Sequence, residues 1–171
     1  AGQICAACHG LDGNGLLGVN PTLAAQHSGY LYKQLREFKN GARENAIMAA
    51  MVANLSDLDM RNLAAFYSQL APIVKGAEDL NLAQQGEAIY RGGIMKKGTP
   101  ACSSCHLANG AGIPENYPRL AGQNKEYIVN QLRAFKNEIR SNDPNSMMRM
   151  IAKTLDENEI DALAEFISGL N

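Results

Sequence analysis

An internal duplication limits what this chain can fold into more than any other feature of its sequence. Residues 5–9 (CAACH) recur at 102–106 (CSSCH), and residues 21–24 (PTLA) recur at 118–121 (PRLA), both at an offset of 97. Further along the offset becomes 100, as in the pairing of Leu55 with Leu155, so we place a three-residue insertion near 142–145. The 171 residues therefore form two copies of one module, each too small to bury more than a marginal core alone.

The join between the copies lies where Pro72 and Gly76 interrupt the helical pattern, which gives a first domain of 1–74 and a second of 75–171. Apolar residues recur at helical spacing within 30–40 and 127–138, and another helix is predicted from about 82 to 90. The helix at 82–90 precedes the second cysteine pair. Because only four residues precede Cys5, we expect its equivalent in the first copy to be incomplete.

Cap signals mark the final helix of each copy. Ser56 precedes Asp59 and Asp156 precedes Glu159, which is the spacing of a capping box. Beta-branched and aromatic residues are sparse, and tryptophan is absent. This composition favours helices joined by glycine-rich loops, so the predicted fold class is all-α, two tandem domains related by internal duplication.

All four cysteines belong to the two repeated motifs, and a histidine follows each pair directly. This C-x-x-C-H pattern is the attachment signature of haem c. The thiols of Cys5 and Cys8, and those of Cys102 and Cys105, would bond the vinyl groups of one porphyrin each. His9 and His106 would then each provide the proximal nitrogen ligand to an iron. Two covalent haem c groups would supply the core that each small module lacks.

Two other uses of the cysteines are compatible with the residue types alone. A redox-active dithiol expects a thioredoxin-like strand and helix, and it needs no histidine. A zinc site from all four thiols would have to join motifs that lie 97 residues apart in different copies, leaving both histidines idle. The motif and its duplication therefore favour haem c.

The repeat also indicates the axial ligands. A low-spin electron carrier needs methionine or histidine opposite its proximal histidine. At the offset of 100 only Met48 and Met148 coincide, whereas the earlier offset of 97 would pair Met51 with Met148. The nearby match of Leu55 to Leu155 favours the later offset. We therefore predict Met48 and Met148 as ligands, in loops between helices, and assign the other methionines to packing.

Three further residues are candidates for the haem environment. His27 is the only histidine outside the motifs, but its counterpart at position 124 is Asn, so we interpret it as a surface or loop residue. Pro21 and Pro118 each follow a motif histidine by twelve residues. The carbonyl of either proline could accept the second ring N–H of that histidine, although a simple turn proline is the alternative.

Taken together, these residues resemble the cytochrome c4 family, di-haem proteins made of two class I cytochrome c domains. The resemblance rests on both C-x-x-C-H motifs, on the P-x-L-A segments, and on residues 34–39 (QLREFK) and 131–136 (QLRAFK). The family places its axial methionine seven residues before a leucine that corresponds to Leu55 and Leu155 here, so the resemblance implies Met48 and Met148 as ligands. Its proline carbonyl beside the proximal histidine corresponds to Pro21 and Pro118.

The resemblance implies a function in the bacterial periplasm. Members are often loosely membrane-associated and pass electrons from a redox donor protein towards a terminal oxidase. We accordingly expect an electron carrier rather than an enzyme, with residues 16–18 and 111–113 as rims where partners dock transiently. An electron-transfer subunit of a larger enzyme, such as a flavocytochrome, is the alternative, and a di-haem peroxidase is a weaker one. The net charge of −1 and the lack of a basic stripe argue against nucleic acid.

Overall fold

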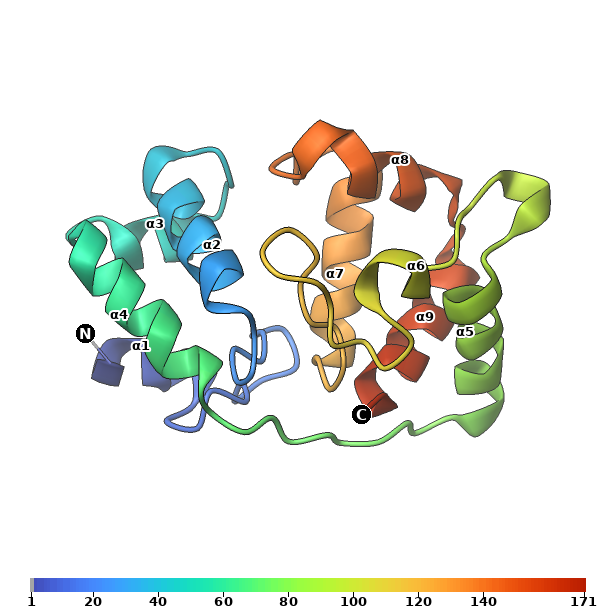
Figure 1. The fold of residues 1–171 in the computed structure, drawn as a ribbon, viewed down its shortest axis with the longest axis horizontal. Helices are drawn as coiled ribbons and strands as arrows, with labels where there is room; N and C mark the ends of the chain where they lie inside the picture. Colours follow the sequence, from blue (N-terminus) through green and yellow to red (C-terminus); the bar gives the residue numbers. More distant parts are fainter. Residues whose placement is uncertain (1) are drawn as a thin grey trace.

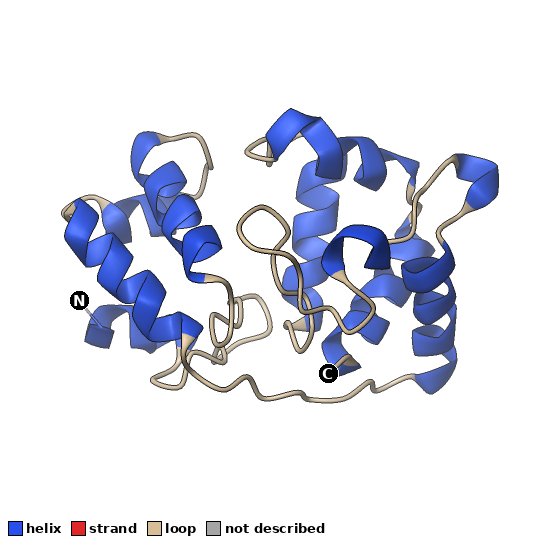
Figure 2. Ribbon diagram, viewed as in Figure 1, coloured by secondary structure: helices blue, strands red, loops and turns tan. Residues whose placement is uncertain are grey.

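The computed structural model describes residues 2–171, with side chains from residue 4 onwards. It is built from helices and loops, and no strand occurs within that range (Figure 2). Figure 1 shows two helical domains side by side, joined by an extended segment that passes below both of them. This arrangement confirms the all-α class with two tandem domains. The connecting segment between the last helix of the first domain and the first helix of the second spans 69–79, and the join inferred from the sequence falls within it.

Within the described residues the first domain contains four helices. They are α1 (Gly2–His9), α2 (Ser28–Asn40), α3 (Ala46–Val52) and α4 (Asp57–Ser68). The second domain contains α5 (Leu80–Gly92), α6 (Ser103–His106), α7 (Lys125–Lys136), α8 (Met147–Thr154) and α9 (Glu157–Gly169), together with short 3₁₀ turns at Met95–Lys97 and Pro144–Ser146. The helices predicted from periodicity are present, with ends displaced by a few residues.

The predicted capping boxes are also confirmed. The Ser56 side chain accepts a hydrogen bond from the Asp59 N–H, and the Asp59 carboxylate accepts one from the Ser56 N–H. Asp156 and Glu159 exchange the same pair of bonds at the start of α9. Each box satisfies backbone donors that the first turn of a helix leaves unpaired.

The core of the second domain forms where its first and last helices meet, and that of the first domain forms between α2 and α4. In the second domain α5 crosses α9 at Gly86, and Tyr90, Ile160 and Leu163 are fully buried there. In the first domain a smaller cluster forms around Leu31, Ala64 and Tyr67, with Cys5 packed against it. Helix α1, which carries the first cysteine pair, therefore packs against the core of the first domain through Cys5.

Polar contacts with twofold character join the domains. Arg43 donates to the Tyr127 hydroxyl at 3.0 Å and to Gln131 at 2.8 Å. Arg140, its counterpart at the offset of 97, donates to the Tyr30 hydroxyl at 2.9 Å and to Gln34 at 3.2 Å. Corresponding residues thus exchange places across the interface, as they do in a symmetric dimer.

The inserted residues of the second copy break this symmetry. Asn142 accepts a hydrogen bond from Lys33 at 2.9 Å through its carbonyl oxygen, and its side-chain amide donates to Glu37. The insertion inferred from the change of offset thus adds a cross-domain contact that the first copy does not reciprocate.

Candidate functional site

The two C-x-x-C-H motifs lie on short helical segments that bring each cysteine pair onto one face. Helix α1 carries Cys5, Cys8 and His9, and residues three apart are neighbours on a helix. In the second domain Cys102 caps α6, and its carbonyl accepts the N–H groups of Cys105 at 3.2 Å and His106 at 2.9 Å. Each histidine therefore leaves the helix directly beyond its cysteine pair.

A proline carbonyl orients each motif histidine. His9 Nδ1 lies 3.1 Å from the Pro21 carbonyl oxygen, and His106 Nδ1 lies 2.9 Å from that of Pro118. Since a carbonyl can only accept, Nδ1 carries the proton in both rings. The lone pair of each ring is thereby left on Nε2, which is the tautomer that a metal-ligating histidine needs.

The electrostatics of the site favour neutral side chains. His9 and His106 are 8% and 6% exposed, and burial lowers the pKa of both imidazoles. Burial likewise raises the pKa of the Cys102 thiol to about 11, and it raises that of Cys5. No cluster of three or more Cys, His, Asp or Glu side chains suited to a metal ion occurs in the described part of the chain.

The methionines lie differently from our expectation. Met48 belongs to α3 and Met148 to α8, so the expectation that both occupy loops is wrong. Asn45 explains the first case, because its side chain accepts the Met48 N–H at 2.9 Å and so starts a helix early. Both methionines are half-buried, whereas Met51 is 46% exposed.

His27 sits at the N-cap of α2, half-buried, outside both motif helices. Its backbone N–H donates to the side chain of Gln26 at 3.1 Å. Its backbone carbonyl accepts the Leu31 N–H at 3.0 Å, which closes the first turn of α2.

Two glutamines that sequence reasoning missed contact the proline loops. Gln123 bonds the backbone of Thr22, next to Pro21, and Gln26 bonds that of Arg119, next to Pro118. Their signal was visible, because both end a repeated P-x-L-A-x-Q segment at the offset of 97. The repeat could not indicate that each one reaches into the other domain.

The donor set fits a covalently attached haem in each domain. In each domain it consists of two thiols on one helical face and a buried imidazole with a free Nε2. Buried polar atoms that have no protein partner, among them Gln34 Nε2 and Arg119 Nε, could bind the carboxylates of such a group.

Several known proteins resemble this chain over nearly its whole length. The cytochrome c family model matches residues 3–71 and 83–171. Cytochrome c4 of Thiocapsa roseopersicina is 43% identical, over 100% of this chain and 89% of that protein. The crystal structure of reduced recombinant cytochrome c4 from Pseudomonas stutzeri superposes with a TM-score of 0.95 at 39% identity, covering 98% of this chain and 94% of that one. A thiosulfate dehydrogenase electron acceptor of Thiomonas intermedia is 38% identical, over 96% of this chain and 77% of that protein.

Proposed function

The chain belongs to the cytochrome c family and, within it, to the cytochromes c4, and we propose that it carries electrons in the bacterial periplasm from a redox donor protein to a membrane terminal oxidase. Its two cytochrome c domains each hold one covalently bound haem c. When bound, each haem supplies a one-electron iron couple. The single observation that carries the proposal is the repeated contact between a buried motif histidine and a proline carbonyl, at 3.1 Å in one domain and 2.9 Å in the other.

The residues of each domain divide the work of holding the cofactor. Cys5 and Cys8 anchor the haem of the first domain, and Cys102 and Cys105 anchor that of the second. His9 and His106 coordinate through Nε2 while Pro21 and Pro118 hold the ring from the other side. The list of ligands is completed by Met48 and Met148, whose half-buried positions support this role better than that of exposed Met51.

If His9 with Met48, and His106 with Met148, hold the two irons, no coordination position would be open to a substrate, so these residues favour electron transfer over chemistry on a substrate. Partners would dock at the exposed apolar rim of the first domain, where Leu16 and Leu17 are 63% and 64% exposed. Ile113 forms the corresponding rim of the second domain. Small apolar rims of this kind suit brief redox encounters.

One experiment tests the cofactor and the carrier function together. Denaturing mass spectrometry of the purified protein should give the chain plus two haem masses, and dithionite-reduced protein should be reoxidised by oxidase-containing membranes. Retention of one haem or none would overturn the assignment of the site. Two haems without reoxidation would overturn the oxidase as acceptor.

The location is tested separately. Haem-staining protein should be released with the periplasmic fraction on osmotic shock, and any membrane-bound remainder should wash off with salt. No helix within the described residues has the length and apolar character needed to cross a membrane. Recovery in the cytoplasmic fraction would contradict the proposal.

The thiosulfate dehydrogenase electron acceptor among the relatives favours a second candidate function. In that case the chain would take electrons from a dehydrogenase as the electron-transfer partner of a larger enzyme. Mixing the oxidised protein with thiosulfate and such a dehydrogenase separates the two functions. Rapid haem reduction would favour the second function, and no reduction would exclude it.

A further inference from the structure

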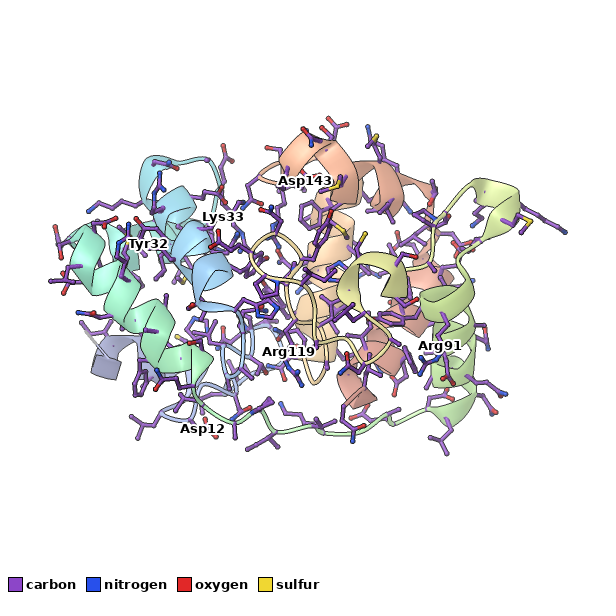
Figure 3. All side chains as sticks on the ribbon, in the orientation of Figure 1. Asp12, Tyr32, Lys33, Arg91, Arg119 and Asp143 are labelled. Carbon is purple, nitrogen blue, oxygen red and sulfur yellow. The ribbon has the colours of Figure 1, made fainter. Side chains whose placement is uncertain are left out.

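Each loop that orients a motif histidine is held by a glutamine from the opposite domain. The Thr22 N–H donates to Gln123 Oε1 at 2.7 Å, and Gln123 Nε2 donates to the Thr22 carbonyl at 3.0 Å. The reverse contact has the same form. The Arg119 N–H donates to Gln26 Oε1, and Gln26 Nε2 donates to the Arg119 carbonyl, both at 2.9 Å. In Figure 3 the labelled Arg119 lies between the two domains.

The glutamines are fixed by their own domains. Gln123 Oε1 also accepts the Asn124 N–H at 2.9 Å, and Gln26 Oε1 accepts the His27 N–H at 3.1 Å. Both lie directly before a long helix, α7 or α2, and they are only 7% and 6% exposed. Because water competes weakly at such buried sites, these hydrogen bonds hold the opposite loop in one place.

The contact reaches the histidine through a single peptide unit. Thr22 follows Pro21, so the peptide group that supplies the acceptor for His9 Nδ1 also supplies the N–H bonded to Gln123. Donation from that N–H polarises the shared peptide group and strengthens its carbonyl as an acceptor. A stronger acceptor at Nδ1 makes the imidazole a more electron-donating ligand, which favours the oxidised metal.

We propose that Gln123 is a positioning residue for His9 and that Gln26 is one for His106, so that each domain tunes the proximal ligand of the other. This inference rests on the proposed function, since it takes both histidines as iron ligands. Asn124 Nδ2 donates to the Asn20 carbonyl at 2.6 Å, but that carbonyl belongs to the peptide unit before Pro21 and not to the one that bonds His9. The arginine contacts across the interface lie further away. Arg43 and Arg140 bond side chains of α7 and α2, and neither contacts a proline loop.

The substitution Gln123→Met tests the proposal, because methionine has a similar length and no amide. In the intact two-haem protein the midpoint potential of the first-domain haem should rise, and that of the second-domain haem should stay unchanged. Each potential is followed through haem-methyl proton resonances, assigned by their contacts to side chains of one domain. The His9 Nδ1–H should exchange with solvent about tenfold faster, the change that corresponds to about 1.4 kcal/mol.

Gln26→Met is the mirror experiment and should move only the second-domain haem and His106. It also keeps the proposal testable if Gln123→Met fails to retain both haems. Gln131→Met is the matched control, because Gln131 accepts a hydrogen bond from Arg43 across the interface at 2.8 Å without touching either proline loop. It should weaken the interface without the crossed pattern.

Three results would each overturn the proposal: a shifted midpoint potential only for the haem of the domain that carries the substitution, equal shifts of both midpoint potentials, or no shift of either. These results are distinct from failure of the proposed function. That failure would appear in the unsubstituted protein, as a missing haem mass or as spectra without histidine ligation.

Discussion

Replacing Gly86 with alanine should destabilise the second domain, although alanine is the better helix former. Gly86 lies within α5 where this helix crosses α9. A Cβ added there would overlap the carbonyl group of Ala162, coming within 2.5 Å of its carbon, and would lie 2.9 Å from the Cβ of Phe166. The neighbouring atom is backbone, so no side-chain rotation can relieve the contact.

The magnitude follows from the distances. Carbon atoms pack best at about 3.5–4.0 Å, so the helices would have to separate by roughly 1 Å. Such a shift loosens the packing of Tyr90, Ile160 and Leu163, which are fully buried at this crossing. Overpacking a core costs about 1–3 kcal/mol and sometimes more, and a rigid backbone neighbour places this site at about 3 kcal/mol.

Thermal unfolding of the haem-loaded protein, followed by circular dichroism, measures the effect. For a chain of this size about 3 kcal/mol corresponds to a fall in Tm of roughly 6–12 °C. Gly92→Ala is the matched control on the same helix, because its added Cβ meets no atom within 4 Å. The control should be neutral or up to about 1 kcal/mol more stable. If Gly86→Ala proves as stable as Gly92→Ala, the helix crossing does not have the close approach described here.

Three further outcomes are expected. Met48→His should lower the midpoint potential of the first-domain haem and leave that of the second-domain haem nearly unchanged, as measured by redox titration. If Met51→Ala removes the near-infrared methionine–iron band and Met48→Ala does not, the assignment of Met48 as a ligand is wrong. Cys102→Ala should yield second domains with weakened haem attachment and lower stability, because the haem fills that core, and full cooperative unfolding at the original Tm would contradict it. Burial raises the pKa of the Glu165 carboxyl, but the Lys125 ammonium and two backbone N–H groups together lower it below its ordinary value. The ionised carboxylate therefore stabilises the folded state above about pH 4.3, and this stabilisation is lost as the pH falls through the folded-state pKa. Glu165→Gln should therefore lower the free energy of unfolding near neutrality by about 1–3 kcal/mol and flatten its decline in acid, and an unchanged pH profile would exclude this role.

Much of the haem site could be predicted from the sequence because its signals are local. Cys5, Cys8 and His9 occupy one short helix, and Ser56 caps a helix through Asp59 three residues away. Such features depend on spacings of three to five residues, which the chain order itself determines. The duplication then supplied a second, independent copy of each signal.

The positions of Met48 and Met148 show where local reasoning was incomplete. Their pairing came from the repeat, but their helices did not, because the Asn45 cap carries none of the carboxylate spacing that marked α4 and α9. The structure places both in helices, half-buried, and the repeat alone gave no reason to expect that.

Only the tertiary structure decided how the two copies meet. Thr22 and Gln123 are 101 residues apart, and Gln26 and Arg119 are 93 apart, so no periodicity within a helix or loop relates them. The repeat shows that each copy contains the same glutamine, but it is equally compatible with a bond inside one copy. Which partner a buried amide finds depends on the surfaces that come together when the two domains pack, and that choice is made by burial and shape across the interface rather than by neighbours in the chain.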